Sequence, residues 1–147
     1  APPAPVADVC HCDSLHLLSL HADIVDMALA LASMSESRRV QQAQAVEGTE
    51  RVCRKLWPGA RVEVYGSLAT GLSVPSSDVD LVVCDVHEYY AALLSGVKQK
   101  GKLNCITKLA EALGRQPWVR SVNAIDGAST PVVKIVTADG VGAGIGA

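Results

Sequence analysis

The sequence predicts an α/β domain with a mixed, mostly antiparallel sheet and helices on one face. Two observations support this fold class: short segments with strand-like alternation recur along the chain, and amphipathic segments with helical spacing separate them. The chain has 147 residues, 49% hydrophobic and 19% charged, which suits one globular core rather than a disordered chain. Its formal net charge of −2 argues against a strongly basic face for nucleic acid.

Helical spacing dominates the first third of the chain. From Leu15 to about Met34, apolar residues recur at intervals of three and four, which predicts a helix. Ser33 and Glu36 form a capping-box pattern, so a second helix is predicted from there to about Leu56, where a Pro-Gly pair ends it.

The rest of the chain alternates between strands and short helices. An Asp-Gly pair at 139–140 predicts a tight hairpin between the last two strands. Strands are predicted at 61–65, 79–84, 119–125, 132–137 and 141–145. Helical segments are predicted at 67–72, 89–94 and 103–113.

The segment 65–84, YGSLATGLSVPSSDVDLVVC, carries the chemistry. Asp78 and Asp80 are two apart at the start of a predicted strand, so their carboxylates point to the same face. Adjacent carboxylates repel each other unless a cation lies between them, and Mg²⁺ prefers carboxylate and phosphate oxygens. Gly66 and Ser67 offer a side-chain-free backbone approach and a hydroxyl, which suit a phosphate. An isolated Asp-x-Asp is commonly a solvated face, but its combination with Gly-Ser predicts a metal–triphosphate site.

Several features leave alternatives open or indicate absences. The five cysteines are odd in number and lack a Cys-x-x-Cys pair, which favours a reducing compartment without disulfides. No uninterrupted run of 18 apolar residues occurs, so no membrane span is predicted. The basic residues at 98–102 fit either a solvated loop or a phosphate contact. The sequence also leaves open whether Lys134, on a late strand, lies near the carboxylates.

The motif resembles that of the nucleotidyltransferases of the DNA polymerase β superfamily, and within them the noncanonical poly(A) and poly(U) polymerases. The likeness rests on Gly66-Ser67 followed, after a spacer, by Asp78-Val79-Asp80-Leu81. It extends over roughly 15–146 and looks closest to the nuclear RNA-surveillance poly(A) polymerases. Further elements are LWPGA at 56–60, TGL at 70–72, PSSD at 75–78 and PVVKIV at 131–136.

The resemblance implies a palm fold and a template-independent transfer of NMP from an NTP to an RNA 3′-hydroxyl. Asp78 and Asp80 would be catalytic and would hold two Mg²⁺ (or Mn²⁺) ions, while Gly66 and Ser67 would bind the nucleotide. ATP is the expected NTP, with UTP open. An RNA-binding partner protein is also implied, as is a location in the nucleus or, second, the cytoplasm. Residues 1–13 are expected to be a Pro/Ala-rich linker, and 14–147 the palm domain, truncated before a helical domain.

Two departures from the family pattern support an alternative. Gly144 stands where the third carboxylate is expected, and the helical domain that holds the base does not follow. Both features fit a catalytically dead module kept for nucleotide binding or as a scaffold.

Overall fold

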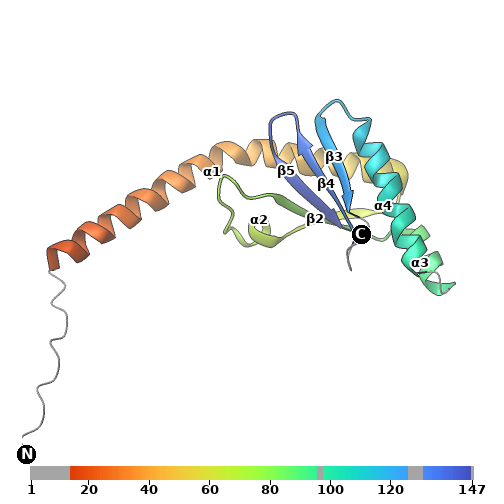
Figure 1. Cartoon of the computed structure of the whole chain (residues 1–147), viewed down its shortest axis with the longest axis horizontal. Coiled ribbons are helices and arrows are strands. Elements are labelled where there is room, and N and C mark those ends of the chain that lie inside the picture. The colour runs from red at the N-terminus through yellow and green to blue at the C-terminus, as the bar shows by residue number, and fades with distance from the viewer. Residues whose placement is uncertain (1–13, 96–97, 126–130, 147) are drawn as a thin grey trace, which may run out of the picture.

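The computed structural model describes residues 14–95, 98–125 and 131–146 (Figure 1). The expected linker at 1–13 lies outside these residues. The elements are, in order, α1 (Ser14–Leu56), β1 (Arg61–Tyr65), α2 (Gly66–Thr70), β2 (Val79–Cys84), α3 (His87–Leu94), α4 (Lys98–Gly114), β3 (Val119–Ile125), β4 (Val132–Thr137) and β5 (Gly142–Gly146).

The five strands form one sheet in the order β1-β2-β5-β4-β3. The β2–β5 pairing is parallel, and the β1–β2, β4–β5 and β3–β4 pairings are antiparallel. The predicted mixed, mostly antiparallel sheet is therefore confirmed. The Asp139-Gly140 hairpin is also confirmed: Gly140 has φ +78°, and Val141 N–H donates to Thr137 Oγ1 at 2.9 Å.

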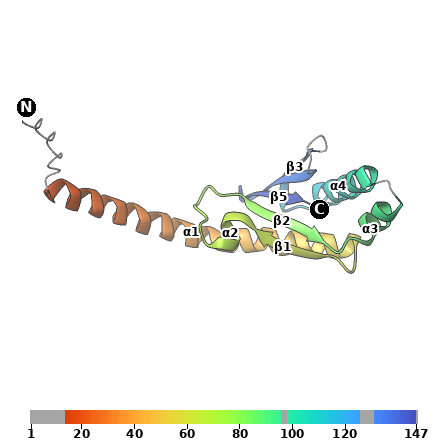
Figure 2. The same cartoon turned by 90° about the horizontal axis from the view of Figure 1, so that it is seen from below.

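Helices α1 and α4 cover one face of the sheet, and α3 packs against α4 (Figure 2). On β2 the covered face carries Val79, Leu81 and Val83, all buried, as the alternation predicts. The opposite face of the sheet, called the open face below, carries Asp80. The core is completed by Ala45, Val52, Cys53, Cys105, Ile106, Leu109, Leu113, Val133, Ile135, Ala143 and Ile145.

A single helix replaces the two that were predicted before the sheet. The prediction of a break at Ser33–Glu36 is wrong, because α1 runs unbroken through 43 residues. No Gly or Pro lies between Ser14 and Glu47, so nothing in the sequence breaks the helix near Ser33. Ser37 Oγ donates to the Met34 carbonyl at 2.8 Å, and Arg39 pairs with Glu36 at 3.0 Å, both contacts within the helix. Hence the capping-box pattern lies inside a helix and caps nothing.

Smaller boundary differences occur elsewhere. Helix α3 begins two residues earlier than predicted, and α4 begins at Lys98, so the basic stretch 98–102 is helical rather than a loop. Its side chains lie outside the described residues. Helix α2 and strand β5 are displaced by one or two residues from the predictions.

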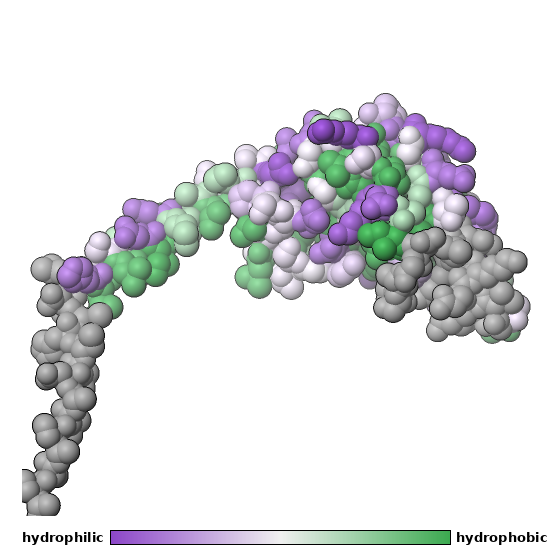
Figure 3. All heavy atoms as spheres, in the orientation of Figure 1, coloured by the Kyte–Doolittle hydropathy of each residue, from purple (hydrophilic) through white to green (hydrophobic). Residues whose placement is uncertain are grey.

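The first half of α1 projects away from the sheet, and apolar side chains gather along it (Figure 3). Leu17, Leu20, Ile24 and Met27, at helical spacing, are each more than half exposed. Among the described residues, α1 is the helix long and apolar enough, by length and composition, to cross a membrane. It carries two aspartates in its exposed part, and an aspartate at a bilayer centre costs about 2.5–3.5 kcal/mol.

Candidate active site

The strand register brings the motif residues together on the open face. Asp80 on β2 lies opposite Tyr65 on β1 and opposite Gly144 on β5. Gly144 in turn lies opposite Lys134 on β4. Cross-strand neighbours share a face, so one row of side-chain positions runs from Tyr65 through Asp80 and Gly144 to Lys134.

Both carboxylates lie above this open face. A methyl group added to Gly144 would lie 3.7 Å from Asp80 Oδ1. A methyl group added to Gly142, which shares the open face with Gly144, would collide with Asp78 Oδ1. Asp78 is exposed and Asp80 half-buried, so solvent reaches the pair from the uncovered side.

Gly66 and Ser67 lie beside Asp80, at the end of β1. Gly66 has φ +68°, and a methyl group on it would collide with Asp80 Oδ2, so glycine is required both by the backbone and by the close approach. Ser67 is half-buried in the first turn of α2. The turn before Asp78 is closed by Ser77, whose Oγ accepts from Val74 N–H at 2.9 Å.

The carboxylate pair can contribute part of a metal shell. No group of three or more His, Cys, Asp or Glu side chains able to hold a metal occurs within the described parts of the chain. Two carboxylates open to solvent nevertheless fit Mg²⁺, which keeps several waters and takes the rest of its ligands from phosphates. Because Gly144 is the neighbour of Asp80, an aspartate at that position would add the third carboxylate.

One feature of the site was missed by reasoning from the sequence, and another was left open. Gly142 belongs to none of the motifs singled out in the sequence, yet its missing side chain makes room for Asp78. The match between the two-residue spacing of Gly142 and Gly144 and that of Asp78 and Asp80 was the available signal. The sequence left open whether Lys134 lies near the carboxylates, and its side chain is exposed on the same face as Asp80.

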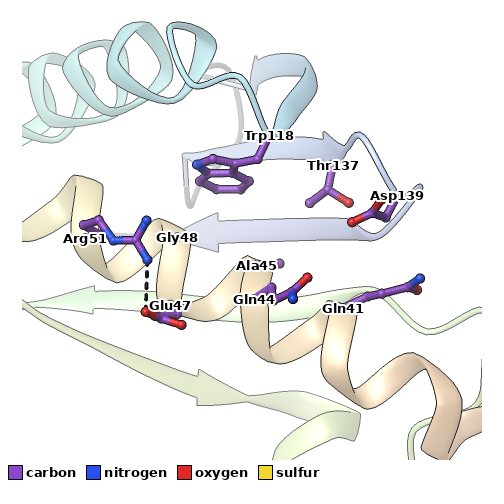
Figure 4. Close-up of a pocket in the computed structure, with 9 residues that line it drawn as sticks. All are labelled: Gln41, Gln44, Ala45, Glu47, Gly48, Arg51, Trp118, Thr137 and Asp139. Carbon is purple, nitrogen blue, oxygen red and sulfur yellow. Dashed lines mark hydrogen bonds and ion pairs between the residues drawn. The ribbon is translucent and has the colours of Figure 1, made fainter.

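A separate hollow of about 250 Å³ lies between α1 and the start of β3 (Figure 4). Trp118 forms one wall over Gly48, and Glu47 and Arg51 pair at 3.0 Å along the helix. None of its lining residues belongs to the Gly-Ser or Asp-x-Asp motif, so this hollow is distinct from the carboxylate site.

Comparison with known proteins gives several related poly(A) polymerases. Poly(A) RNA polymerase CID14 of Cryptococcus neoformans is 33% identical over 95 residues, which are 65% of this chain and 11% of that protein. Trf4-2 of Drosophila melanogaster, a poly(A) RNA polymerase protein whose name marks it as inactive, is 50% identical over 42 residues, 29% of this chain and 10% of that protein. The chain thus spans about a tenth of each.

Solved structures share the fold. The polymerase core of TRAMP, an RNA surveillance complex, has a TM-score of 0.65 and 25% identity, covering 84% of this chain and 35% of that one. The structure of mtPAP with ATPγS has a TM-score of 0.56 and 20% identity, covering 71% of this chain and 24% of that one. The family model described as "Poly(A) RNA polymerase, mitochondrial-like, central palm domain" matches residues 20–141. With its sheet, its open-face carboxylates and this match over most of its length, the chain belongs to the family of mitochondrial-like poly(A) RNA polymerase central palm domains.

Proposed function

We propose that this chain is the catalytic palm of a template-independent RNA 3′-terminal nucleotidyltransferase of the poly(A) polymerase type. The observation that carries the proposal is the position of Asp78 and Asp80 on the open face, beside the Gly66-Ser67 turn. The reaction transfers NMP from an NTP to the 3′-hydroxyl of RNA and releases pyrophosphate.

Each motif residue has a role in this proposal. Asp78 and Asp80 hold Mg²⁺ or Mn²⁺, which supplies charge stabilisation for the attacking and leaving oxygens. The bare backbone of Gly66 and the Ser67 hydroxyl take the triphosphate. ATP is the proposed NTP, because the relatives are named poly(A) polymerases.

RNA binding is proposed to depend on more than this domain. The formal net charge of −2 gives little electrostatic attraction for phosphates. We therefore assign part of the RNA affinity to a partner protein, and note that the TRAMP polymerase core belongs to a complex. The nucleus is the proposed location, with the cytoplasm second.

A second candidate is a catalytically dead module that binds nucleotide or serves as a scaffold. Gly144 favours it, because the neighbour of Asp80 has no carboxylate to complete the site on the side away from Gly66. One relative is itself named inactive. This candidate retains nucleotide binding and loses transfer.

Coupled binding of Mg²⁺ and a non-hydrolysable ATP analogue tests the carboxylate assignment. Two carboxylates leave most of an octahedral shell to water and phosphate, so Mg²⁺ should bind weakly alone and more tightly with the analogue. Asp80→Ala should abolish this coupling in a calorimetric titration. Asp139→Ala, which removes the same charge from the exposed hairpin turn, should preserve it. Equal coupling in the two variants would refute the assignment.

Primer extension tests the role of position 144. The 147-residue chain should lengthen a labelled oligoribonucleotide barely or not at all. The Gly144→Asp variant of the same chain should also give little extension, because the assay then contains no helical domain to hold the base. Gly144→Asp in a protein that also carries the family's helical domain should raise kcat by orders of magnitude. Robust extension by the unmodified chain would show that another residue fills the third ligand's role.

A further inference from the structure

Lys134 is an exposed cation on the open face of the sheet, two strands from Asp80. It lies opposite Gly144 on β5, which lies opposite Asp80 on β2. With strands about 4.8 Å apart, the Lys134 and Asp80 backbones are roughly 10 Å apart. No ion pair joins the Lys134 ammonium to any carboxylate of the described residues.

The position between the two residues carries no side chain. The nearest atoms to a methyl group added at Gly144 would be Asp80 Oδ1 at 3.7 Å and Val132 Cγ1 at 3.8 Å. A long lysine side chain can therefore extend from β4 over the bare backbone toward Asp80. An aspartate at position 144 would instead be the direct cross-strand neighbour of Lys134 and would pair with it.

The strand order indicates whether the Lys134 ammonium lies near the triphosphate or near the RNA acceptor strand. Gly66 and Ser67 follow β1, on one side of Asp80, whereas Lys134 on β4 lies on the other side. In the proposed function the triphosphate takes the β1 side, which leaves the β4 side for the attacking strand. The attacking strand is the RNA that supplies the 3′-hydroxyl, and its anionic groups are the phosphodiesters of its backbone.

We propose that Lys134 binds the phosphodiester backbone at the 3′ end of the RNA. This inference rests on the proposed function and adds the residue that receives the acceptor strand. Lysine binds phosphate as a point charge, and here it offsets the repulsion between the RNA and two adjacent carboxylates. Because position 144 is glycine, no carboxylate stands directly opposite Lys134 on β5 to pair with the ammonium.

The test is fluorescence anisotropy of a labelled oligoadenylate with the 147-residue chain at low salt, in the presence of Mg²⁺ and a non-hydrolysable ATP analogue. Lys134→Gln should weaken RNA binding by about fivefold, the upper range for an exposed ion pair. It should also reduce the salt slope by about 0.7, the value for one single-strand phosphate contact. Lys134→Arg should retain both the RNA affinity and the salt slope of the unmodified chain. Lys55→Gln, an equal charge change in the last turn of α1, should have no such effect.

A second pair of variants tests the competition at position 144. Gly144→Asp should lower the RNA affinity, and adding Lys134→Gln to it should change little, because the ammonium is already paired. Gly144→Ala, whose methyl group fits at ordinary contact distance, should bind RNA as the unmodified chain does.

Each contrary result has a distinct meaning. Equal RNA affinity for the Lys134→Gln and Lys55→Gln chains, or no RNA binding by the unmodified chain at low salt, overturns the inference. Loss of affinity for the ATP analogue without loss of RNA binding also overturns it, since Lys134 would then contact the triphosphate. The proposed function fails separately, through unchanged Mg²⁺–nucleotide coupling in Asp80→Ala.

Discussion

Replacing Gly66 by alanine should damage both the fold and the proposed nucleotide site. At φ +68° an alanine adopts a left-handed conformation that costs about 1 kcal/mol or more. Its methyl group would also collide with Asp80 Oδ2, so the Asp80 side chain must leave its rotamer, at a further cost of about 0.5–1.5 kcal/mol. The free energy of unfolding should therefore fall by roughly 1.5–3.5 kcal/mol in total.

Gly71→Ala is the matched control for the backbone part of this effect. Gly71 has φ +74° and no atom within 4 Å of an added methyl group, so it carries the conformational cost without the collision. Urea denaturation should show Gly71→Ala losing about 1 kcal/mol and Gly66→Ala losing more. Gly140→Ala, also with φ +78° and open space, should behave as Gly71→Ala does.

The functional consequence separates the two variants more sharply. Changing a residue that positions a metal ligand commonly weakens metal affinity by about tenfold or more. Gly66→Ala should therefore weaken the coupled binding of Mg²⁺ and the ATP analogue by at least that factor, and Gly71→Ala should not. Identical nucleotide binding in the two variants would refute the close approach of Gly66 to Asp80 as a feature of the site.

Two further predictions concern the core. A methyl group at Gly48 would lie 2.7 Å from the Trp118 ring, so Gly48→Ala should destabilise the unmodified chain but stabilise a Trp118→Ala chain by about 1 kcal/mol, measured as a double-mutant cycle in urea. Equal effects in both backgrounds would contradict the contact. Burial raises the pKa of Cys53 from 9.0 to about 12. The unfolded chain then loses this proton before the folded one, so stability should fall as pH rises from about 9 to 12. Cys53→Ala should reduce that slope, and an unchanged slope would contradict the assignment.

The sequence predicted best where local signals agree. Strands at 61–65, 79–84, 119–125 and 132–137 were placed to the residue, because each is rich in β-branched residues and is bounded by turn residues. The break in α1 was predicted wrongly from a local capping pattern that says nothing about whether the backbone at Ser33 is helical.

Contacts between distant segments could not be read from local patterns. The pairing of Asp80 with Gly144 depends on the register of a parallel strand pair. Likewise no local pattern explains the glycine at position 48, since the Trp118 ring that packs on it comes from the residue just before β3. The site roles of Asp78 and Asp80 remain predictions that the geometry supports.

The projecting half of α1 divides the molecule into regions of unequal local stability. Every side chain from His16 to Ala30 is exposed, and half-buried side chains begin at Leu31. The Ser35 Oγ then donates to the Ser73 carbonyl at 3.4 Å. An unsupported helix of this length is marginal in water, so it should open without unfolding the sheet. Amide hydrogens should thus exchange fast near Ser14 and progressively more slowly beyond Ser35, as a gradient along one continuous helix.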